Sequence, residues 1–209
     1  MGEAGQTIRG QTIRRGRKFD QVLAGARDIF LRDGFEGASV DDIARAAGVS
    51  KATLYSYFPD KRLLFLEVAK AECARAADEA EALIGEDVPV AQALHLAGER
   101  IVAFAQSDFG QRMFRMCVAE SDRFPALGTA FYESGPELVR ARLVRFLAKS
   151  AARGEVRIDD LDLAADQFAQ LCKADLHDKA IFGIAEAAPR DVARVVQGAV
   201  EMFMARYGV

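Results

Sequence analysis

The hydrophobic positions of this chain recur mainly at steps of three and four residues, which is the spacing of one face of an α-helix. The first such series ends at Gly34, where we expect the first helix to stop. Its members are Phe19, Val22, Leu23, Ala26, Ile29 and Phe30. Few segments alternate between apolar and polar residues with a period of two, as half-buried strands do. The pattern therefore predicts an all-α protein.

A short capped segment follows the first helix. Ser39 can cap a helix over residues 40–47, and Asp42, three residues later, supplies the carboxylate of a capping box. Gly48 and Val49 then suit a tight turn. We expect the helix over 40–47 to end at this turn.

A second short helix follows the turn. Ser50 can cap it, and the Phe58-Pro59 pair ends it after residue 57. Asp60 can cap a longer helix over residues 61 to about 84. A helix, a glycine turn and a second short helix together predict a helix-turn-helix.

The second short helix carries side chains that suit DNA. Leu54 and Phe58 lie four residues apart and can anchor it to a core, which leaves its other face free. Backbone N–H groups and a lysine at a helix N-terminus suit phosphate, and Ala or Thr methyl groups can touch thymine. The candidate contacts on this face are Lys51, Ala52, Thr53, Tyr55 and Tyr57.

Charge is unevenly distributed along the chain. The net charge is −3, although residues 1–18 contain five basic residues and one acidic residue. A short basic arm before an acidic body is typical of a nucleic-acid-binding tail, and a merely solvated tail has the same composition. The arm is expected to have no fixed structure when free. Its candidate DNA contacts are Arg14, Arg15, Arg17 and Lys18.

The segment GFEGASVDDIARAAGVSKATLYSYFPDKRLLF resembles the DNA-binding signature of the TetR family of bacterial transcriptional regulators. The resemblance spans roughly residues 19–65. It implies a three-helix DNA-binding domain over 19–60 and an all-helical domain over 61–209 that binds a ligand and dimerises. It further implies repression that a small molecule relieves. By motif position, the implied phosphate contacts are Ser39, Ser50, Tyr55, Tyr57 and Lys61, and the implied neighbours of base edges are Lys51, Ala52 and Thr53.

Two departures from the family pattern are visible. Many relatives have Gly where this chain has Ala52, so the backbone is expected to approach DNA less closely there. Gly37-Ala38 precedes Ser39, where Ala-Thr is common, which removes one expected phosphate contact.

Helical patterning continues beyond Pro89, and five helices of bundle length are expected. Their predicted ranges are 88–107, 109–122, 136–153, 161–182 and 190–207, with a break at Phe124-Pro125. Segments of this region, among them ADLHDKAIFG, also resemble a common regulatory body of the TetR family. Candidate ligand contacts are the soft or aromatic residues of the middle helices and one histidine, although each is also an ordinary core residue type. They are Phe104, Met113, Phe114, Cys117, Phe131, Phe168 and His177.

The last two helices have broad apolar faces. These faces suit a four-helix homodimer interface, and the core of a single chain has the same pattern. A dimer with two DNA-binding domains implies a palindromic operator. The residues that suggest the interface include Val192, Val196, Val200 and Phe203.

Other protein classes find little support. The longest uncharged stretch is far too short for a membrane span, and the N-terminus lacks the apolar run of a signal peptide, so we expect a cytoplasmic protein. The three widely spaced cysteines fit reduced core thiols better than disulfides or a metal site, and no cofactor is expected. An architectural DNA-binding protein without an effector, or an all-helical enzyme, remains an alternative to a ligand-responsive repressor.

Overall fold

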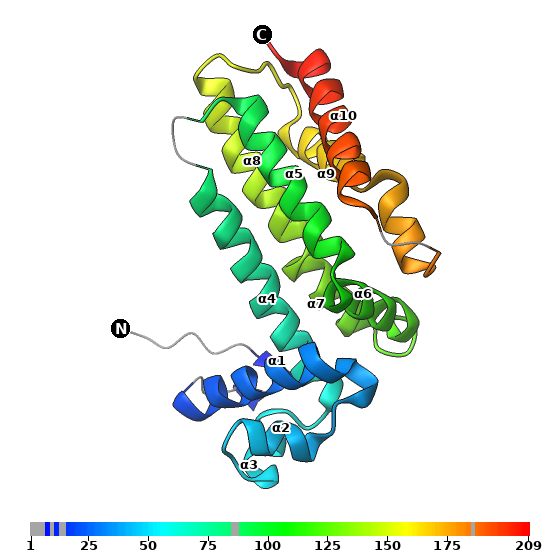
Figure 1. The fold of residues 1–209 in the computed structure, drawn as a ribbon. Helices are drawn as coiled ribbons and strands as arrows, with labels where there is room; N and C mark the ends of the chain where they lie inside the picture. Colours follow the sequence, from blue (N-terminus) through cyan, green and yellow to red (C-terminus); the bar gives the residue numbers. More distant parts are fainter. Residues whose placement is uncertain (1–6, 9–10, 13–15, 85–87, 185–186) are drawn as a thin grey trace. The chain divides into compact units, whose positions relative to one another are not determined.

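Ten α-helices account for most of the described chain in this computed structural model, which confirms the predicted all-α class (Figure 1). The structure describes residues 7–8, 11–12, 16–84, 88–184 and 187–209. The chain divides into two compact units, Met1–Ala71 and Glu72–Val209, and the boundary between them falls inside α4 (Lys61–Leu83). The domain boundary predicted between residues 60 and 61 lies at the start of this helix.

Apart from α4, each helix belongs to one unit. The first unit contains α1 (Arg17–Gly37), α2 (Val40–Ala46) and α3 (Lys51–Tyr57). The second contains α5 (Val90–Gln106), α6 (Asp108–Glu120), α7 (Pro125–Ser134), α8 (Pro136–Ala152), α9 (Leu161–Ile181) and α10 (Pro189–Tyr207). All the predicted helices are present, with ends within one turn of the expected positions.

Helix α7 is the one helix of the described residues that the sequence pattern misses. We expected only a break at Phe124-Pro125, but Pro125 is the first residue of a ten-residue helix. Proline is well tolerated there, because the first N–H groups of a helix have no partner within the helix in any case. Gly135 ends α7, and Pro136 begins α8 in the same way.

The N-terminal arm also differs from expectation. Strand β1 (Thr7–Ile8) pairs antiparallel with β2 (Gln11–Thr12), so that Thr7 lies opposite Thr12. β-branched Thr and Ile favour an extended backbone, which explains why pairing occurs at these residues. A two-stranded hairpin of this length is marginally stable by itself.

Aromatic rings form the centre of the first unit. Phe19 of α1 lies 5.3 Å from Phe58 between ring centroids, and Phe30 meets Phe65 of α4 edge-to-face at 4.7 Å. The helical backbone of α1 is interrupted at Gly34, with φ 70° and ψ −178°, a conformation that side chains strongly disfavour. This interruption confirms the expected end of the regular helix.

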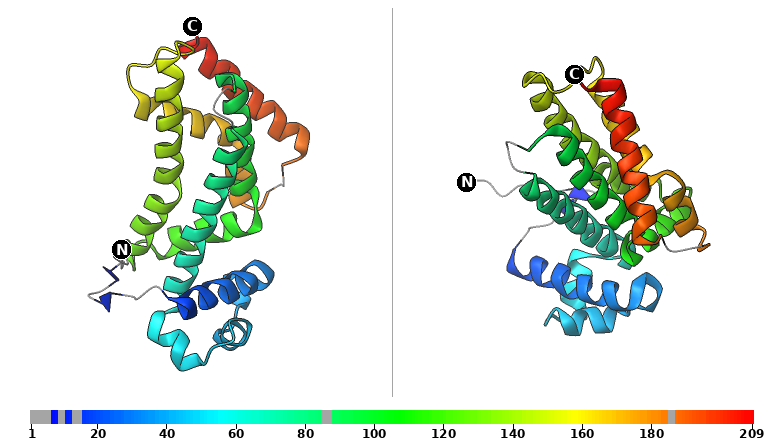
Figure 2. Two further views of the ribbon diagram at one scale, coloured as in Figure 1. Left: turned by 90° about the vertical axis from the view of Figure 1, so that its left-hand side faces the viewer. Right: turned by 45° about the horizontal axis from the view of Figure 1, so that its top comes forward.

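The core of the second unit lies among α5, α8, α9 and α10, and the further views show these helices around one interior (Figure 2). Its fully buried side chains include Leu94, Val102, Leu147, Phe168, Cys172 and Val196. The segment after α8 closes one end of the unit, because the Arg157 N–H donates to the Tyr207 carbonyl at 2.8 Å.

Glu155 caps the start of α5. Its carboxylate accepts a hydrogen bond from the Val90 N–H at 2.8 Å, at the helix end that favours negative charge. The Arg153 side chain, followed by this backbone bond, holds the pKa of Glu155 below its usual value. The contact ties the loop after α8 to α5.

The three cysteines are free and buried, as predicted. Burial raises the pKa of Cys73, Cys117 and Cys172 to about 12 in each case. The thiols therefore stay protonated at neutral pH and behave as small apolar side chains.

We predict that Gly25→Ala destabilises the first unit. A Cβ atom at Gly25 would lie 2.5 Å from the backbone nitrogen of Ala47, and backbone cannot move aside as a flexible side chain can. Overpacking of this kind lowers the free energy of unfolding by about 1–3 kcal/mol. Gly128→Ala in α7 is the control, because its new Cβ would lie 3.5 Å from the nearest atom, an ordinary contact. Chemical denaturation of the full chain measures both variants, and equal stability would contradict the proposed clash.

Candidate nucleic-acid interface and effector site

The helix-turn-helix is built on a glycine turn. Gly48 adopts φ 63°, and the Val49 N–H donates to the Ala44 carbonyl at 3.0 Å, which closes the end of α2. Leu54 is 1% exposed and fastens one side of α3 to the core. The opposite side of α3 therefore faces away from the core of its unit.

Most of the candidate contacts on α3 lie on this outward side. The exposed members are Lys51, Ala52 and Tyr55. Thr53 and Tyr57 are half-buried, and the Tyr57 ring packs edge-on against Phe19 with centroids 5.9 Å apart. The helix thus presents together a cation, a methyl group and a phenol, which are groups that can contact bases and phosphates.

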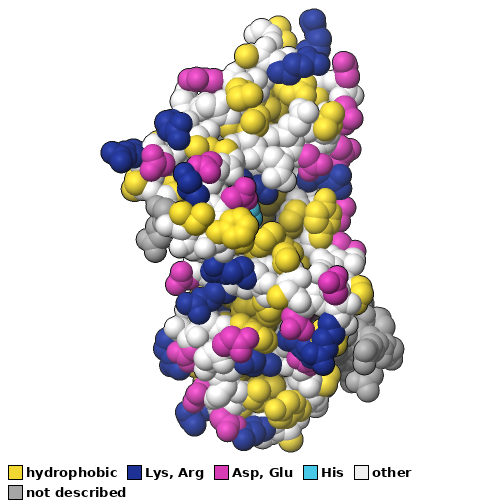
Figure 3. Space-filling view, turned by 90° about the vertical axis from the view of Figure 1, so that its right-hand side faces the viewer, with side chains coloured by type: hydrophobic (Ala, Val, Ile, Leu, Met, Phe, Trp, Pro, Cys, Tyr) yellow, Lys and Arg dark blue, Asp and Glu magenta, His cyan; other side chains and the backbone are white. Residues whose placement is uncertain are grey.

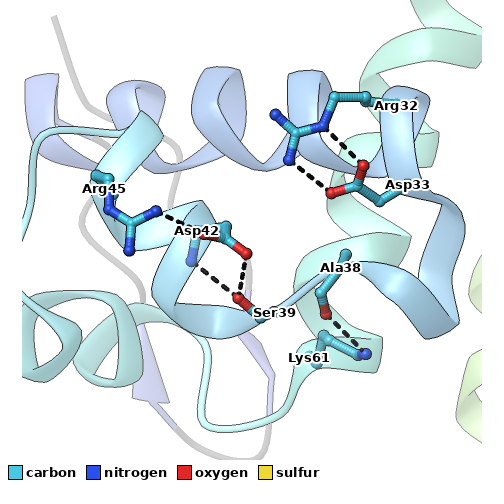
Figure 4. A network of polar contacts seen from close by, with 7 residues as sticks. All are labelled: Arg32, Asp33, Ala38, Ser39, Asp42, Arg45 and Lys61. Atoms are coloured by element: carbon cyan, nitrogen blue, oxygen red, sulfur yellow. Dashed lines mark hydrogen bonds and ion pairs between the residues drawn. The ribbon is translucent and has the colours of Figure 1, made fainter.

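Both predicted serine caps are present. The Ser39 hydroxyl accepts from the Asp42 N–H at 3.0 Å and donates to the Asp42 carboxylate at 2.6 Å (Figure 4). Hydrogen bonds from Ser39 and then Arg45 hold the pKa of Asp42 below its usual value. The Ser50 hydroxyl accepts from the Thr53 N–H at 3.1 Å and caps α3.

Lys51 already has a partner. Its ammonium forms an ion pair with Asp41, in the first turn of α2, and both side chains are more than half exposed. A phosphate or base that approaches Lys51 therefore competes with a carboxylate. Sequence reasoning missed Asp41, because its closeness to Lys51 depends on how the turn sets α2 against α3.

Lys61 is held by the end of α1. Its ammonium donates to the carbonyls of Phe35 at 2.8 Å and Ala38 at 3.1 Å, and it lies 4.5 Å from the centroid of the Phe35 ring. Figure 4 shows the bond to Ala38. An ammonium has three N–H groups, so one donor remains for the phosphate contact that the resemblance implies.

The arm residues fall into two groups. Arg17 and Lys18 are exposed at the start of α1. Arg14 and Arg15 lie outside the described residues. The contribution of the arm to DNA binding stays a prediction.

In the second unit, several candidate effector contacts meet one another. Phe114 packs edge-to-face against His177, with ring centroids 5.0 Å apart, and against Phe131, with centroids 6.2 Å apart. Cys117 and Met113, one turn apart on α6, bring their sulfur atoms to 3.4 Å. These contacts connect α6, α7 and α9.

The remaining candidates lie differently. Phe168 is fully buried and packs against Phe203 of α10 at 5.6 Å, as part of the core. Phe104 is half-buried near the end of α5. Neither side chain has a ring contact with Phe114 or His177 among the described residues.

Lys173 is a half-buried cation on α9 that sequence reasoning did not single out. It precedes His177 by four residues, and this was the signal that the sequence offered, although the interruption of α9 at Ala174 means that the two residues do not share the face of a regular helix. Its charge contributes to lowering the pKa of His177, after the larger effect of burial. The two side chains are therefore electrostatic neighbours.

No helix in the described parts of the chain combines the length and hydropathy that a membrane crossing requires. Within the same ranges, no three His, Cys, Asp or Glu side chains gather as a metal site would need.

A capped helix-turn-helix whose second helix exposes Lys51, Ala52 and Tyr55, followed by a separate helical bundle, is typical of the class of helix-turn-helix regulators. The family description "Bacterial regulatory proteins, tetR family" matches residues 22–68, and "AefR-like transcriptional repressor, C-terminal domain" matches residues 92–209. Because the second match covers more than half of the chain, this protein belongs to the TetR family of transcriptional regulators.

Individual relatives agree with this assignment. The HTH-type transcriptional repressor AcnR of Corynebacterium efficiens is 40% identical over 58 residues, which are 28% of this chain and 31% of that protein. The chain thus spans about a third of this curated relative. A TetR-family regulator from Mesorhizobium loti is 30% identical, with a TM-score of 0.81, over 92% of this chain and 98% of the other. The flavonoid-responsive regulator FrrA is 32% identical, with a TM-score of 0.68, over 93% and 98%.

We predict that Asp41→Asn strengthens DNA binding by freeing Lys51. An exposed ion pair is worth at most about 1 kcal/mol, so the gain in affinity should be about two- to fivefold. Electrophoretic shifts should be measured for Asp41→Asn, Lys51→Met and the double variant. If Asp41 acts through Lys51, its substitution has no effect once Lys51 is absent. An equal gain in both backgrounds would indicate only a general loss of negative charge.

Proposed function

We propose that this protein is a ligand-responsive transcriptional repressor that acts in the cytoplasm. It binds a palindromic operator as a homodimer and leaves it when a small aromatic or apolar molecule binds. The observation that carries the DNA-binding half is the outward face of α3, where Lys51, Ala52 and Tyr55 are exposed on a helix fixed by Ser50 and Leu54.

A groove between α9 and α10 supports the homodimer. It has a volume of about 650 Å³, and its lining includes Gln170, Leu171, Met202 and Tyr207. Met202 is 61% exposed, although it is a large apolar residue. An apolar side chain on the rim of an open groove suits contact with the same helices of a second copy.

The structure changes which residues can test this interface. Val196 and Phe203 are 0% and 2% exposed within a single chain, because both pack in the core of the second unit. A charge at either position would disturb folding before it disturbed assembly. Met202 is the better probe, because it is accessible without unfolding.

The effector half of the proposal rests on the contacts among Phe114, Phe131 and His177. Aromatic rings that meet at the junction of three helices suit an aromatic guest. FrrA, which is described as flavonoid-responsive, supports the same chemical class. A guest that converts a dimer from 99% to 1% DNA-competent must favour the incompetent form by about 5.5 kcal/mol.

The proposal predicts different effects for Thr53→Ala and Lys61→Ala. Thr53 lies near base edges, so its substitution should change which sequences bind. Lys61 is assigned to phosphate, so its loss should weaken operator and scrambled DNA alike. Operator fragments are selected from genomic DNA and compared with scrambled DNA by electrophoretic shift. Thermal unfolding of Lys61→Ala is the control, because the variant also loses two hydrogen bonds to α1. Unchanged binding by both folded variants would refute the assigned interface.

We also predict that Met202→Glu yields monomers with weak operator binding. A buried carboxylate at a dimer interface would lack a partner, and a monomer reaches only one half-site. Val118→Glu is the matched control, because Val118 is similarly exposed, at 58%, but lies on α6. Sedimentation equilibrium of both variants decides the matter, and a dimeric Met202→Glu variant would place the interface elsewhere.

A further inference from the structure

Helix α9 is interrupted beside the aromatic contacts of the second unit. Ala174 has φ 28° and ψ −130°, and it is the only non-glycine residue of the described chain with a positive φ. Side chains rarely adopt this region, so the surrounding structure must hold the residue there. The neighbouring Lys173 thus stands at a break in the helix rather than on a regular face.

Side chains from two other helices hold the segment after this break. The Gln106 amide donates to the Leu176 carbonyl at 2.8 Å, and Arg115 donates to the Ile181 carbonyl at 3.0 Å. These two polar groups are therefore engaged with backbone. They tie the position of His177 to α5 and α6.

Lys173 has no such partner. Its side chain is half-buried, and it makes no hydrogen bond or ion pair with any residue in the described ranges. Burial lowers its pKa, while Asp166 and Asp178 lie near enough to favour the charged form without pairing with it. By contrast, Lys179 on the same helix is paired with Asp175. A half-buried ammonium that lacks a partner favours an anion beside it.

His177 has unused hydrogen-bonding capacity next to this cation. Its Nδ1 atom is buried and has no hydrogen-bond partner among the described residues. Burial, and then the charge of Lys173, lower the pKa of His177, so the ring is neutral at pH 7 and offers one donor and one acceptor. The ring also lies against Phe114, which continues to Phe131.

The polar groups of Lys173 and His177 therefore adjoin the aromatic rings of Phe114 and Phe131. In the space-filling view of one face, a histidine is just visible, with acidic, basic and hydrophobic side chains around it (Figure 3). A neutral aromatic molecule could pack against these rings, but it would leave the Lys173 ammonium without a partner. An acidic group on the same molecule would satisfy it.

We propose that Lys173 and His177 bind the negatively charged group of an organic anion whose aromatic part packs against Phe114 and Phe131. This inference rests on the proposed function, because it defines the chemical class of the effector. Lys173 supplies the charge-assisted hydrogen bond, and the neutral imidazole supplies a second donor.

Two fluorescent probes of nearly identical shape test the proposal. They are 8-anilinonaphthalene-1-sulfonate and its neutral counterpart N-phenyl-1-naphthylamine, and each is titrated into the full chain without DNA. The wild type should bind the sulfonate more tightly than the neutral probe. Lys173→Met should weaken sulfonate binding by about tenfold or more and change binding of the neutral probe less than about twofold. Lys173→Arg should largely restore sulfonate binding, because it keeps the charge.

Lys179→Met is the matched control, since it removes a lysine from the same helix that already has a carboxylate partner. It should leave both affinities unchanged. Equal affinities for the two probes in the wild type, equal losses of both in Lys173→Met, or equal losses of the sulfonate in the two Met variants would each overturn the proposal.

These titrations contain no DNA, so they are independent of repression. If sulfonate binding depends on Lys173 but organic anions never release operator DNA, the anion site stands and the proposed ligand response fails. If neutral aromatic molecules alone release operator DNA and sulfonate binding does not depend on Lys173, the ligand response stands and the anion site is wrong.

Discussion

Helix α4 belongs to both units, and this continuity is the constraint on which the rest of the structure depends. At its first residue, the Lys61 ammonium is held by the carbonyls of Phe35 and Ala38 in the DNA-binding unit. In its last turns, Asp78 and Glu81 pair with Arg142 of α8 in the regulatory unit. No interruption of its helical backbone lies between these attachments. We infer that a change in one unit reaches the other through the position of this helix.

The two attachments differ in strength. Hydrogen bonds from a charged donor such as Lys61 are worth about 1.5–3 kcal/mol each, and contact with the Phe35 ring adds to them. Asp78 and Glu81 are more than half exposed, so each pair with Arg142 contributes at most about 1 kcal/mol. These ion pairs by themselves therefore resist a movement of α4 less than the contacts of Lys61 do. We expect α4 to shift against α8 while it stays fixed to α1.

The helix-turn-helix was predictable because local chemistry determines it. Ser39, Gly48 and Ser50 each specify a boundary through a cap or a turn, and the observed bounds of α2 and α3 follow from them. Helix α7 was missed because Pro125 has two opposite local meanings, a stop for one helix and a start for another. The choice between these meanings depends on packing, which sequence periodicity does not contain.

The residue types of the candidate sites were predictable from the sequence, but the partners that their side chains have within the chain were not. The position of Lys51 on the second short helix, and for Lys61 the family resemblance, predicted contacts with DNA. In the structure, however, a carboxylate holds Lys51 and backbone carbonyls hold Lys61. Lys173, which has no partner among the described residues, was not singled out at all, because its isolation arises from burial beside a break in α9. A cation that already has a partner gains less from a new anion than its charge implies, because one interaction replaces another. If Lys51 contacts DNA as proposed, it must exchange its carboxylate partner for the new one, whereas an anion at Lys173 would fill an unmet requirement.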